Sequence, residues 1–123
     1  MIFMAAVEKI DEIRPLAETV FEGRGSLVTA LPGMLEVLPL GASKATALTE
    51  LLRHLKVPPE RVLALGDGEN DIEMLQMAGV GVAMGNAVQA TRNVAAVTTA
   101  SNNEDGWAQA IEKYVLQPKR RTL

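Results

Sequence analysis

The sequence predicts an α/β fold, with a parallel sheet and helices preceded by a smaller α+β unit. From residue 43 onward, helical apolar patterns alternate with short apolar runs at residues 62–65 and 80–84, which is typical of parallel strands joined by helices. Before residue 40, the order is strand, helix, strand, strand, which favours an antiparallel pair beside a helix.

The first 39 residues predict the smaller unit element by element. An apolar run at residues 1–7 predicts a strand. The next apolar residues recur at helical spacing, and Gly23-Arg24-Gly25 ends that helix. Residues 26–31 and 34–38 are predicted strands, joined by a turn at Pro32-Gly33. The helical positions are Ile10, Ile13, Leu16, Ala17 and Val20.

The remaining residues predict the parallel layer. Ser43 is the expected N-cap of a helix that ends before Pro58-Pro59, and strand 62–65 leads into a helix ending near residue 77. We expect Asn86 to cap a helix over residues 88–93. A short strand over 94–99 and a helix from Asp105 complete the layer; Trp107 is expected to be buried between helix and sheet, with a partner interface as the alternative.

Composition and charge exclude several classes of protein. Twelve basic and 15 acidic residues give a net charge of -3, so the basic stripe typical of nucleic-acid binding is absent. The one basic run, Lys119-Arg120-Arg121, is expected to be a solvated tail. The chain contains no cysteine, which excludes disulfides and thiolate sites and suits a reducing compartment. No apolar run is long enough for a membrane span, so we expect a soluble protein and leave its compartment open.

The segment GDGENDIEML, residues 66–75, follows directly on the apolar run 62–65. Its turn places four oxygen-bearing side chains at the carboxyl end of a parallel strand, where α/β sheets hold their ligands: Asp67, Glu69, Asn70 and Asp71. Such side chains suit a hard cation such as Mg²⁺. The alternative is structural, because Asp and Asn are ordinary helix caps and acidic residues are favoured in any first helical turn.

This segment resembles the fourth signature motif of the haloacid dehalogenase superfamily, in the form found in its Cof-like sugar-phosphate phosphatases. Residues 40–48 (LGASKATAL) resemble the third motif, with Lys44 at the motif lysine. Residues 78–87 and 100–106 are similar to segments downstream of the fourth motif. Four blocks in the family's order cover most of residues 40–115, so the resemblance implies a partial haloacid dehalogenase-like, Rossmannoid core.

The resemblance also defines what is missing. The family's nucleophile belongs to an early Asp-x-Asp segment, and these 123 residues contain no Asp-x-Asp. We therefore expect the C-terminal portion of a longer phosphatase, with residues 1–39 as a remnant of the cap domain and residues 40–123 as the C-terminal half of the core.

The resemblance implies a role for each matched residue. Asp67 is the expected Mg²⁺ ligand, and Asp71 is expected to coordinate the metal directly or through water and to orient the site. Asn70 would contact a phosphate oxygen or the metal shell, and Lys44 would bring a positive charge to the phosphate. Glu69 is expected to face solvent or the cap. Asn102, Asn103 and Glu104 lie in a loop expected near the catalytic face, where one of them contacts phosphate or caps a helix.

The implied activity is hydrolysis of a small phosphomonoester through an aspartyl-phosphate, and the implied partner is a small phosphorylated metabolite. The chain alone is expected to be inactive without the nucleophile. Three alternatives remain: a truncated form that acts as a binding or interaction module, an inert product of truncation, and half of a complemented enzyme. Neither nucleic acid nor membrane is an expected partner. We expect either a homo-oligomer or association with the missing N-terminal portion.

Overall fold

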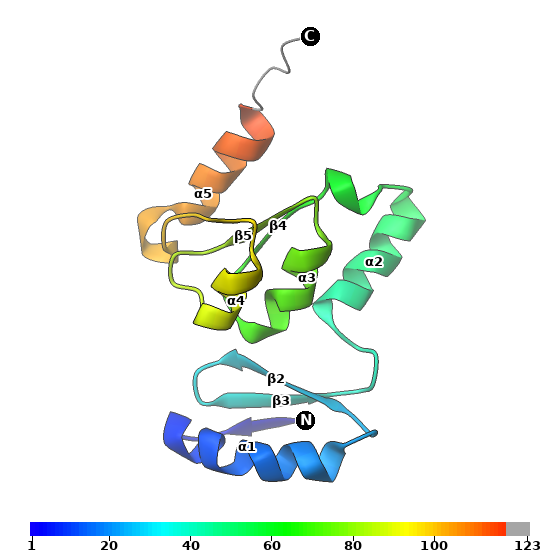
Figure 1. Cartoon of the computed structure of the whole chain (residues 1–123), viewed down its shortest axis with the longest axis vertical. Coiled ribbons are helices and arrows are strands. Elements are labelled where there is room, and N and C mark those ends of the chain that lie inside the picture. Colours follow the sequence, from blue (N-terminus) through cyan, green and yellow to red (C-terminus); the bar gives the residue numbers. More distant parts are fainter. Residues whose placement is uncertain (118–123) are drawn as a thin grey trace.

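The computed structural model describes residues 1–117, so the basic run at residues 119–121 lies outside the described part. These residues form two sheets of three strands each. Figure 1 shows β2 and β3 of one sheet below β4 and β5 of the other. Sheet A is antiparallel with strand order β1-β3-β2, and sheet B is parallel with strand order β4-β5-β6. The predicted α/β class, with an α+β unit before a parallel layer, is confirmed.

Sheet A contains β1 (Ile2–Met4), β2 (Ser26–Leu31) and β3 (Met34–Leu38), with helix α1 (Val7–Phe21) packed against it. Leu35 and Val37 of β3 are buried, as is Ile10 of α1. The alternate side chains of β3 point to the opposite face, because successive strand residues alternate. Strand β2 is the edge strand nearest to the rest of the molecule (Figure 1).

Sheet B contains β4 (Leu63–Gly66), β5 (Val80–Ala83) and β6 (Val97–Thr98). Helix α2 (Lys44–Leu55) precedes it, and Ser43 caps this helix as predicted, since its hydroxyl accepts a hydrogen bond from the Thr46 N–H. Helices α3 (Ile72–Met77), α4 (Gln89–Val94) and α5 (Gly106–Ile111) follow. Among residues 1–117, β4 pairs only with β5, so its other edge is unpaired.

Two predictions about sheet B are wrong. Asn86 does not cap α4, whose N-cap is Val88; the Asn86 side chain instead bonds two loops. Trp107 is not buried between helix and sheet, because 60% of it is exposed. No helix within the described residues is both long and apolar enough to cross a membrane.

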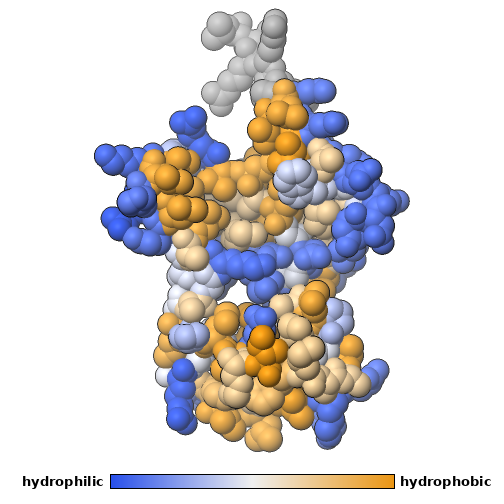
Figure 2. All heavy atoms as spheres, turned by 180° about the vertical axis from the view of Figure 1, so that it is seen from behind, coloured by the Kyte–Doolittle hydropathy of each residue, from blue (hydrophilic) through white to orange (hydrophobic). Residues whose placement is uncertain are grey.

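The surface retains large apolar side chains on both halves of the molecule. Figure 2 shows hydrophobic residues over the upper and lower halves of one face, separated by a band of hydrophilic residues. Exposed apolar residues of this size include Ile2 and Met4 on β1 and Leu51, Leu55 and Trp107 on the helices beside sheet B. Natural monomers seldom leave large apolar patches bare.

Candidate active site

The loop after β4 is organised by the carboxylate of Asp71. Asp71 is only 4% exposed, and its Oδ2 accepts hydrogen bonds from the backbone N–H groups of Asp67, at 2.9 Å, and Gly68, at 3.1 Å. A Cβ atom at Gly66 would lie 2.4 Å from the Cβ of Asp71, so glycine is needed where this side chain crosses the strand. Asp71 thereby holds the preceding turn; it stands at the N-cap position of α3, but its side chain makes no capping hydrogen bond to that helix.

Lys44 forms an ion pair with the second carboxylate oxygen of Asp71. It is the first residue of α2, and its Nζ donates to Oδ1 of Asp71 at 2.5 Å. Half of the Lys44 side chain is exposed, so the amine neutralises a buried carboxylate while keeping one side accessible. The structure thus brings together Lys44 and Asp71, which are 27 positions apart in the sequence.

Asp67 occupies a different environment from Asp71. It is exposed, and its Oδ2 accepts a hydrogen bond from Nδ2 of Asn86 at 2.9 Å. The Oδ1 of Asn86 accepts the N–H of Asn102, also at 2.9 Å, so Asn86 connects the loops after β4 and β5 with the loop that begins α5. Sequence reasoning missed this role. Its signal was the position of Asn86 just beyond β5, because neighbouring parallel strands bring their carboxyl ends together.

Asn102 is the member of its loop that contacts the site, through its backbone N–H. Glu104 instead accepts a hydrogen bond from the Ser101 hydroxyl at 2.6 Å and caps its own short helical turn. The hydrogen bonds from the hydroxyl and N–H of Ser101 lower the pKa of Glu104. Thr91 of α4 was also missed: it is fully buried, and its hydroxyl donates to the carbonyl of Gly68 at 2.8 Å.

Glu69 connects the site loop to sheet A. Its carboxylate accepts two hydrogen bonds from the Arg14 guanidinium, at 2.6 and 3.0 Å, and one from the Thr29 N–H at 2.7 Å. The Thr29 hydroxyl accepts a further bond from Arg14. The register of β2 shifts between Thr29 and Leu31, where this edge strand meets the loop. Of the two orientations expected for Glu69, the structure has the one towards residues 1–39, which the sequence analysis expects to be the cap remnant.

These contacts shift two ionisation equilibria. Burial by itself raises the pKa of Glu69, but the hydrogen bonds from Arg14 and Thr29 outweigh burial, so the net pKa lies below its usual value. The pKa of Arg14 is raised, chiefly by its hydrogen bond to Glu69 and further by Glu18. Both groups are therefore charged at neutral pH. We call Arg14, Thr29 and Glu69 the inter-sheet cluster.

The carboxylate oxygens of this loop could supply some of the ligands of a Mg²⁺ ion. Within residues 1–117, Oδ1 of Asp67 accepts no hydrogen bond, whereas both oxygens of Asp71 accept hydrogen bonds. Among the described residues there is no group of three or more His, Cys, Asp or Glu placed to hold a metal. Mg²⁺ tolerates few protein ligands, because it keeps several waters and often binds substrate phosphate. These residues therefore fit a Mg²⁺ ion that Asp67 would bind directly, while Asp71 holds the loop in shape.

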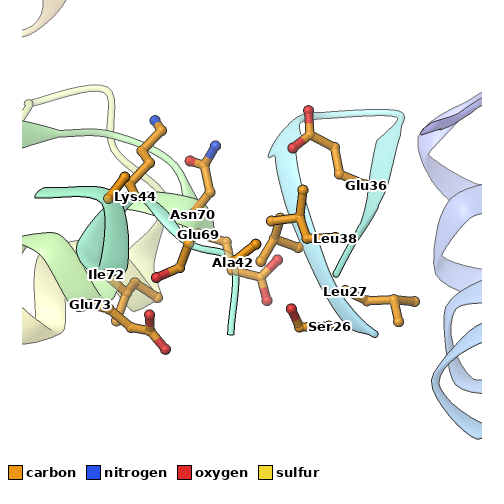
Figure 3. A pocket seen from close by; sticks show the side chains of 13 residues that line it. Ser26, Leu27, Glu36, Leu38, Ala42, Lys44, Glu69, Asn70, Ile72 and Glu73 are labelled. Atoms are coloured by element: carbon orange, nitrogen blue, oxygen red, sulfur yellow. The ribbon is translucent and has the colours of Figure 1, made fainter. Parts of the chain in front are cut away.

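Lys44 lines two of the hollows that open onto these residues. One of about 520 Å³ lies at the carboxyl end of β4 and is lined by Lys44, Asp67 and Asp71 together with apolar side chains that include Leu65 and Trp107. Another, of about 600 Å³, lies between sheet A and the site loop, and Lys44 and Asn70 line it. Figure 3 shows Lys44 and Asn70 projecting from the core side of this second hollow.

Comparison with known proteins gives a consistent result. A family model described as haloacid dehalogenase-like hydrolase matches residues 1–111. The chloroplastic endoribonuclease YBEY of Arabidopsis thaliana is 45% identical over 93% of this chain and 20% of that protein. The 5-amino-6-(5-phospho-D-ribitylamino)uracil phosphatase YcsE of Bacillus subtilis is 39% identical over 89% of this chain and 41% of that protein.

A solved structure extends the comparison to the fold. A putative HAD/COF-like hydrolase from Plasmodium vivax superposes with a TM-score of 0.86 and 26% identity, over 90% of this chain and 39% of that one. The chain thus spans about two fifths or less of each of these three proteins. The family-model match over residues 1–111 covers all the strands of both sheets and the loop that carries Asp67 and Asp71. This chain belongs to the haloacid dehalogenase-like hydrolase family.

Proposed function

We propose that this chain supplies the metal- and phosphate-binding half of a Mg²⁺-dependent phosphatase that hydrolyses small phosphomonoesters of the sugar-phosphate type. The observation that carries the proposal is the convergence of Lys44, Asp67, Asn70 and Asp71 at the carboxyl end of β4. Family phosphatases generally use Mg²⁺, and the B. subtilis relative YcsE is named as a phosphatase of a phosphorylated ribityl compound.

Each residue has a role that its environment supports. Lys44 presents an accessible ammonium to an anionic substrate, and Asp71 fixes that ammonium through a short ion pair. Asn70 presents a side-chain amide to the same hollow, where it can donate to a phosphate oxygen. Asp67 offers its Oδ1 to the cation. A bound Mg²⁺ would neutralise charge on the phosphate oxygens.

Covalent hydrolysis also needs an attacking carboxylate, which we place on another polypeptide segment. The family resemblance implies an Asp-x-Asp nucleophile beside the strand matched by β4, and the unpaired edge of β4 accommodates such a strand. The hollow at the carboxyl end of β4 combines apolar residues with Lys44, Asp67 and Asp71, so a strand added beside β4 in parallel would end beside the site. We therefore propose that the 123-residue chain binds phosphate without turnover until that segment joins it.

The test separates binding from turnover. Inorganic phosphate added with Mg²⁺ to the ¹⁵N-labelled chain is expected to shift the amide signals of Lys44 and Asn70, and Lys44→Met is expected to abolish the shifts. Arg53→Met is the matched control, since Arg53 is an exposed cation elsewhere on α2. Release of p-nitrophenol from its phosphate ester is expected to stay at background. If the chain alone hydrolysed the ester in a Mg²⁺-dependent way, and Asp67→Ala abolished that activity, the proposal that another segment must supply the nucleophile would be wrong.

The alternative function is a binding module without hydrolysis in any assembly. The sequence observation behind it is the lack of an Asp-x-Asp segment in these 123 residues. Adding a polypeptide that carries such a segment distinguishes the two. Recovered phosphatase activity supports the complemented enzyme, whereas tight Mg²⁺ binding with no turnover in the mixture supports the binding module.

A further inference from the structure

Asn86 is bonded through both ends of its side-chain amide, although it lies in an exposed loop between β5 and α4. Its Nδ2 donates to Oδ2 of Asp67 at 2.9 Å, and its Oδ1 accepts the backbone N–H of Asn102 at 2.9 Å. Asp67 follows β4, Asn86 follows β5, and Asn102 follows β6. One amide group therefore connects the loops that follow all three strands of sheet B.

The two partners of Asn86 fix the orientation of its amide. A backbone N–H only donates, so the atom of Asn86 that faces Asn102 is the carbonyl oxygen. The amide nitrogen then faces Asp67, whose carboxylate only accepts hydrogen bonds at neutral pH. Neither a carboxylate nor a hydrocarbon side chain at this position would supply the donor to Asp67.

The loops are joined without this side chain. The N–H of Val88 donates to the carbonyl of Asp67 at 2.9 Å, and the N–H of Gly85 donates to the carbonyl of Ala100 at 3.0 Å. A Cβ atom at Gly85 would lie 2.8 Å from the carbonyl carbon of Ala100, so the two backbones are already in close contact. The side-chain bonds of Asn86 are exposed to water, and such bonds add little to stability. Holding the loops together does not account for Asn86.

The bond from Asn86 instead determines which oxygen of Asp67 is available to a ligand. An exposed side chain samples several rotamers, and ordering it when a ligand binds costs conformational entropy. The amide holds Oδ2, whereas Oδ1 accepts no hydrogen bond from residues 1–117. Carboxylates that bind metal ions are commonly held by hydrogen bonds of this kind from residues that do not touch the metal.

The partner of Asp67 is also neutral, which leaves the negative charge of the carboxylate available to a cation. The nearby ammonium of Lys44 pairs with Asp71 instead. A cationic partner on Asp67 would repel a metal ion bound to the same carboxylate. The amide of Asn86 orients Asp67 without that repulsion.

Building on the proposed function, in which Asp67 binds Mg²⁺, we propose that Asn86 is a positioning residue of the metal site. It does not contact the cation. It holds the Asp67 carboxylate in the orientation that leaves Oδ1 for the metal, and the N–H of Asn102 holds the Asn86 amide in turn. Asn86 therefore affects Mg²⁺ affinity through the orientation of Asp67.

The first measurement is an NMR titration of the complete ¹⁵N-labelled chain with Mg²⁺ alone, which gives a dissociation constant from the amide shifts of residues 67–71. Asn86→Ala is expected to weaken Mg²⁺ binding about tenfold, the lower end of the usual effect of removing a residue that orients a metal ligand. Asn93→Ala is the matched control, because Asn93 is an exposed asparagine whose side chain bonds only to Gln89 on α4 in residues 1–117. It should leave the Mg²⁺ affinity unchanged.

The second measurement reads the orientation of Asp67 without any metal. Three-bond couplings across the first side-chain torsion of Asp67 are expected to report one rotamer in the parent chain and an average over several in Asn86→Ala. Asn93→Ala should retain the parent couplings. The urea midpoint of Asn86→Ala should stay close to that of Asn93→Ala, because the backbone bonds between the loops remain.

The outcomes separate this inference from the proposed function. If Asp67→Asn abolishes the Mg²⁺ shifts but Asn86→Ala binds Mg²⁺ as the parent does, the metal site stands and Asn86 has no part in it. If Mg²⁺ shifts no amide of residues 67–71 in the parent, the proposed metal site fails and the inference fails with it. If Asp67 already samples several rotamers in the parent, Asn86 does not orient it and the inference is wrong. This last result needs no variant to fold.

Discussion

Asp67 and Asp71 are four residues apart in one loop, yet the fold assigns them different tasks. Asp71 is buried and bonded to Lys44 and to two backbone N–H groups, whereas Asp67 is exposed and bonded to one side-chain amide. A buried carboxylate with this many donors stabilises the loop, and an exposed one is available to a ligand. The two substitutions should therefore separate stability from binding.

We expect Asp71→Ala to lower the free energy of unfolding by about 3 kcal/mol, because it leaves Lys44 unpaired and two backbone N–H groups without acceptors. Asp67→Ala should cost less than about 1 kcal/mol, since it removes one exposed hydrogen bond. Urea unfolding followed by circular dichroism measures both. Equal losses would show that the loop does not depend on the Asp71 carboxylate.

Magnesium binding, unlike the free energy of unfolding, should depend more on Asp67 than on Asp71. Because one carboxylate oxygen of Asp67 accepts no hydrogen bond from residues 1–117, the chain alone is expected to bind Mg²⁺ weakly, and Asp67→Asn should reduce that binding further. Calorimetric titration, with Asp105→Asn as a control on another loop, measures the effect. Magnesium binding that is unaffected by Asp67→Asn would place the cation elsewhere in the chain.

At the scale of elements, the inter-sheet cluster links α1 and β2 of sheet A to the loop after β4. Its ion pair is bidentate, and each of the two side chains is less than one third exposed. Ion pairs of this geometry exceed exposed single-contact pairs in strength, since less water competes for the charges. The cluster sets how sheet A lies against the unit carrying Lys44.

A double-mutant cycle on Arg14→Met and Glu69→Gln is expected to give a coupling free energy of about 1 to 2 kcal/mol, between the values for exposed pairs and charged buried hydrogen bonds. The pair Arg53–Glu50 on α2 is the control, because both side chains are about 70% exposed. That control should show no coupling above experimental error. If the coupling free energy of Arg14–Glu69 were as small as that of the control pair, the inter-sheet cluster would not stabilise the contact between sheet A and the loop after β4.

At the scale of the whole molecule, β4 has an unpaired edge within residues 1–117, and its carboxyl end lines a hollow together with Lys44, Asp71 and the exposed Trp107. An open edge next to apolar side chains favours association with another chain. Either a second copy or a polypeptide carrying the nucleophile segment would cover it.

We expect sedimentation velocity to detect self-association or binding to such a polypeptide, and amide exchange in β4 to slow on assembly. Trp107→Gln should weaken association, whereas Gln109→Ala on the same short helix serves as the control. A stable monomer whose β4 amides are already strongly protected would contradict this expectation, because some other part of the chain would then cover the edge.

The sequence alone determined the fold class, the order of the elements and the loop that carries Asp67, Asn70 and Asp71. These features follow from local signals: apolar periodicity, glycine and proline at turns, and a motif contained within ten residues. The Ser43 cap was predictable for the same reason, since a capping box spans four consecutive positions.

Only the tertiary structure decided the roles that depend on contacts between distant segments. Asn86 has the local signature of a helix cap, but the meeting of parallel strand ends bonds it to Asp67. Glu69 is an ordinary loop residue in sequence, and its partners Arg14 and Thr29 lie 55 and 40 positions away. Such contacts produce no recurring pattern in the sequence, because the partner of each residue is set by how the elements pack.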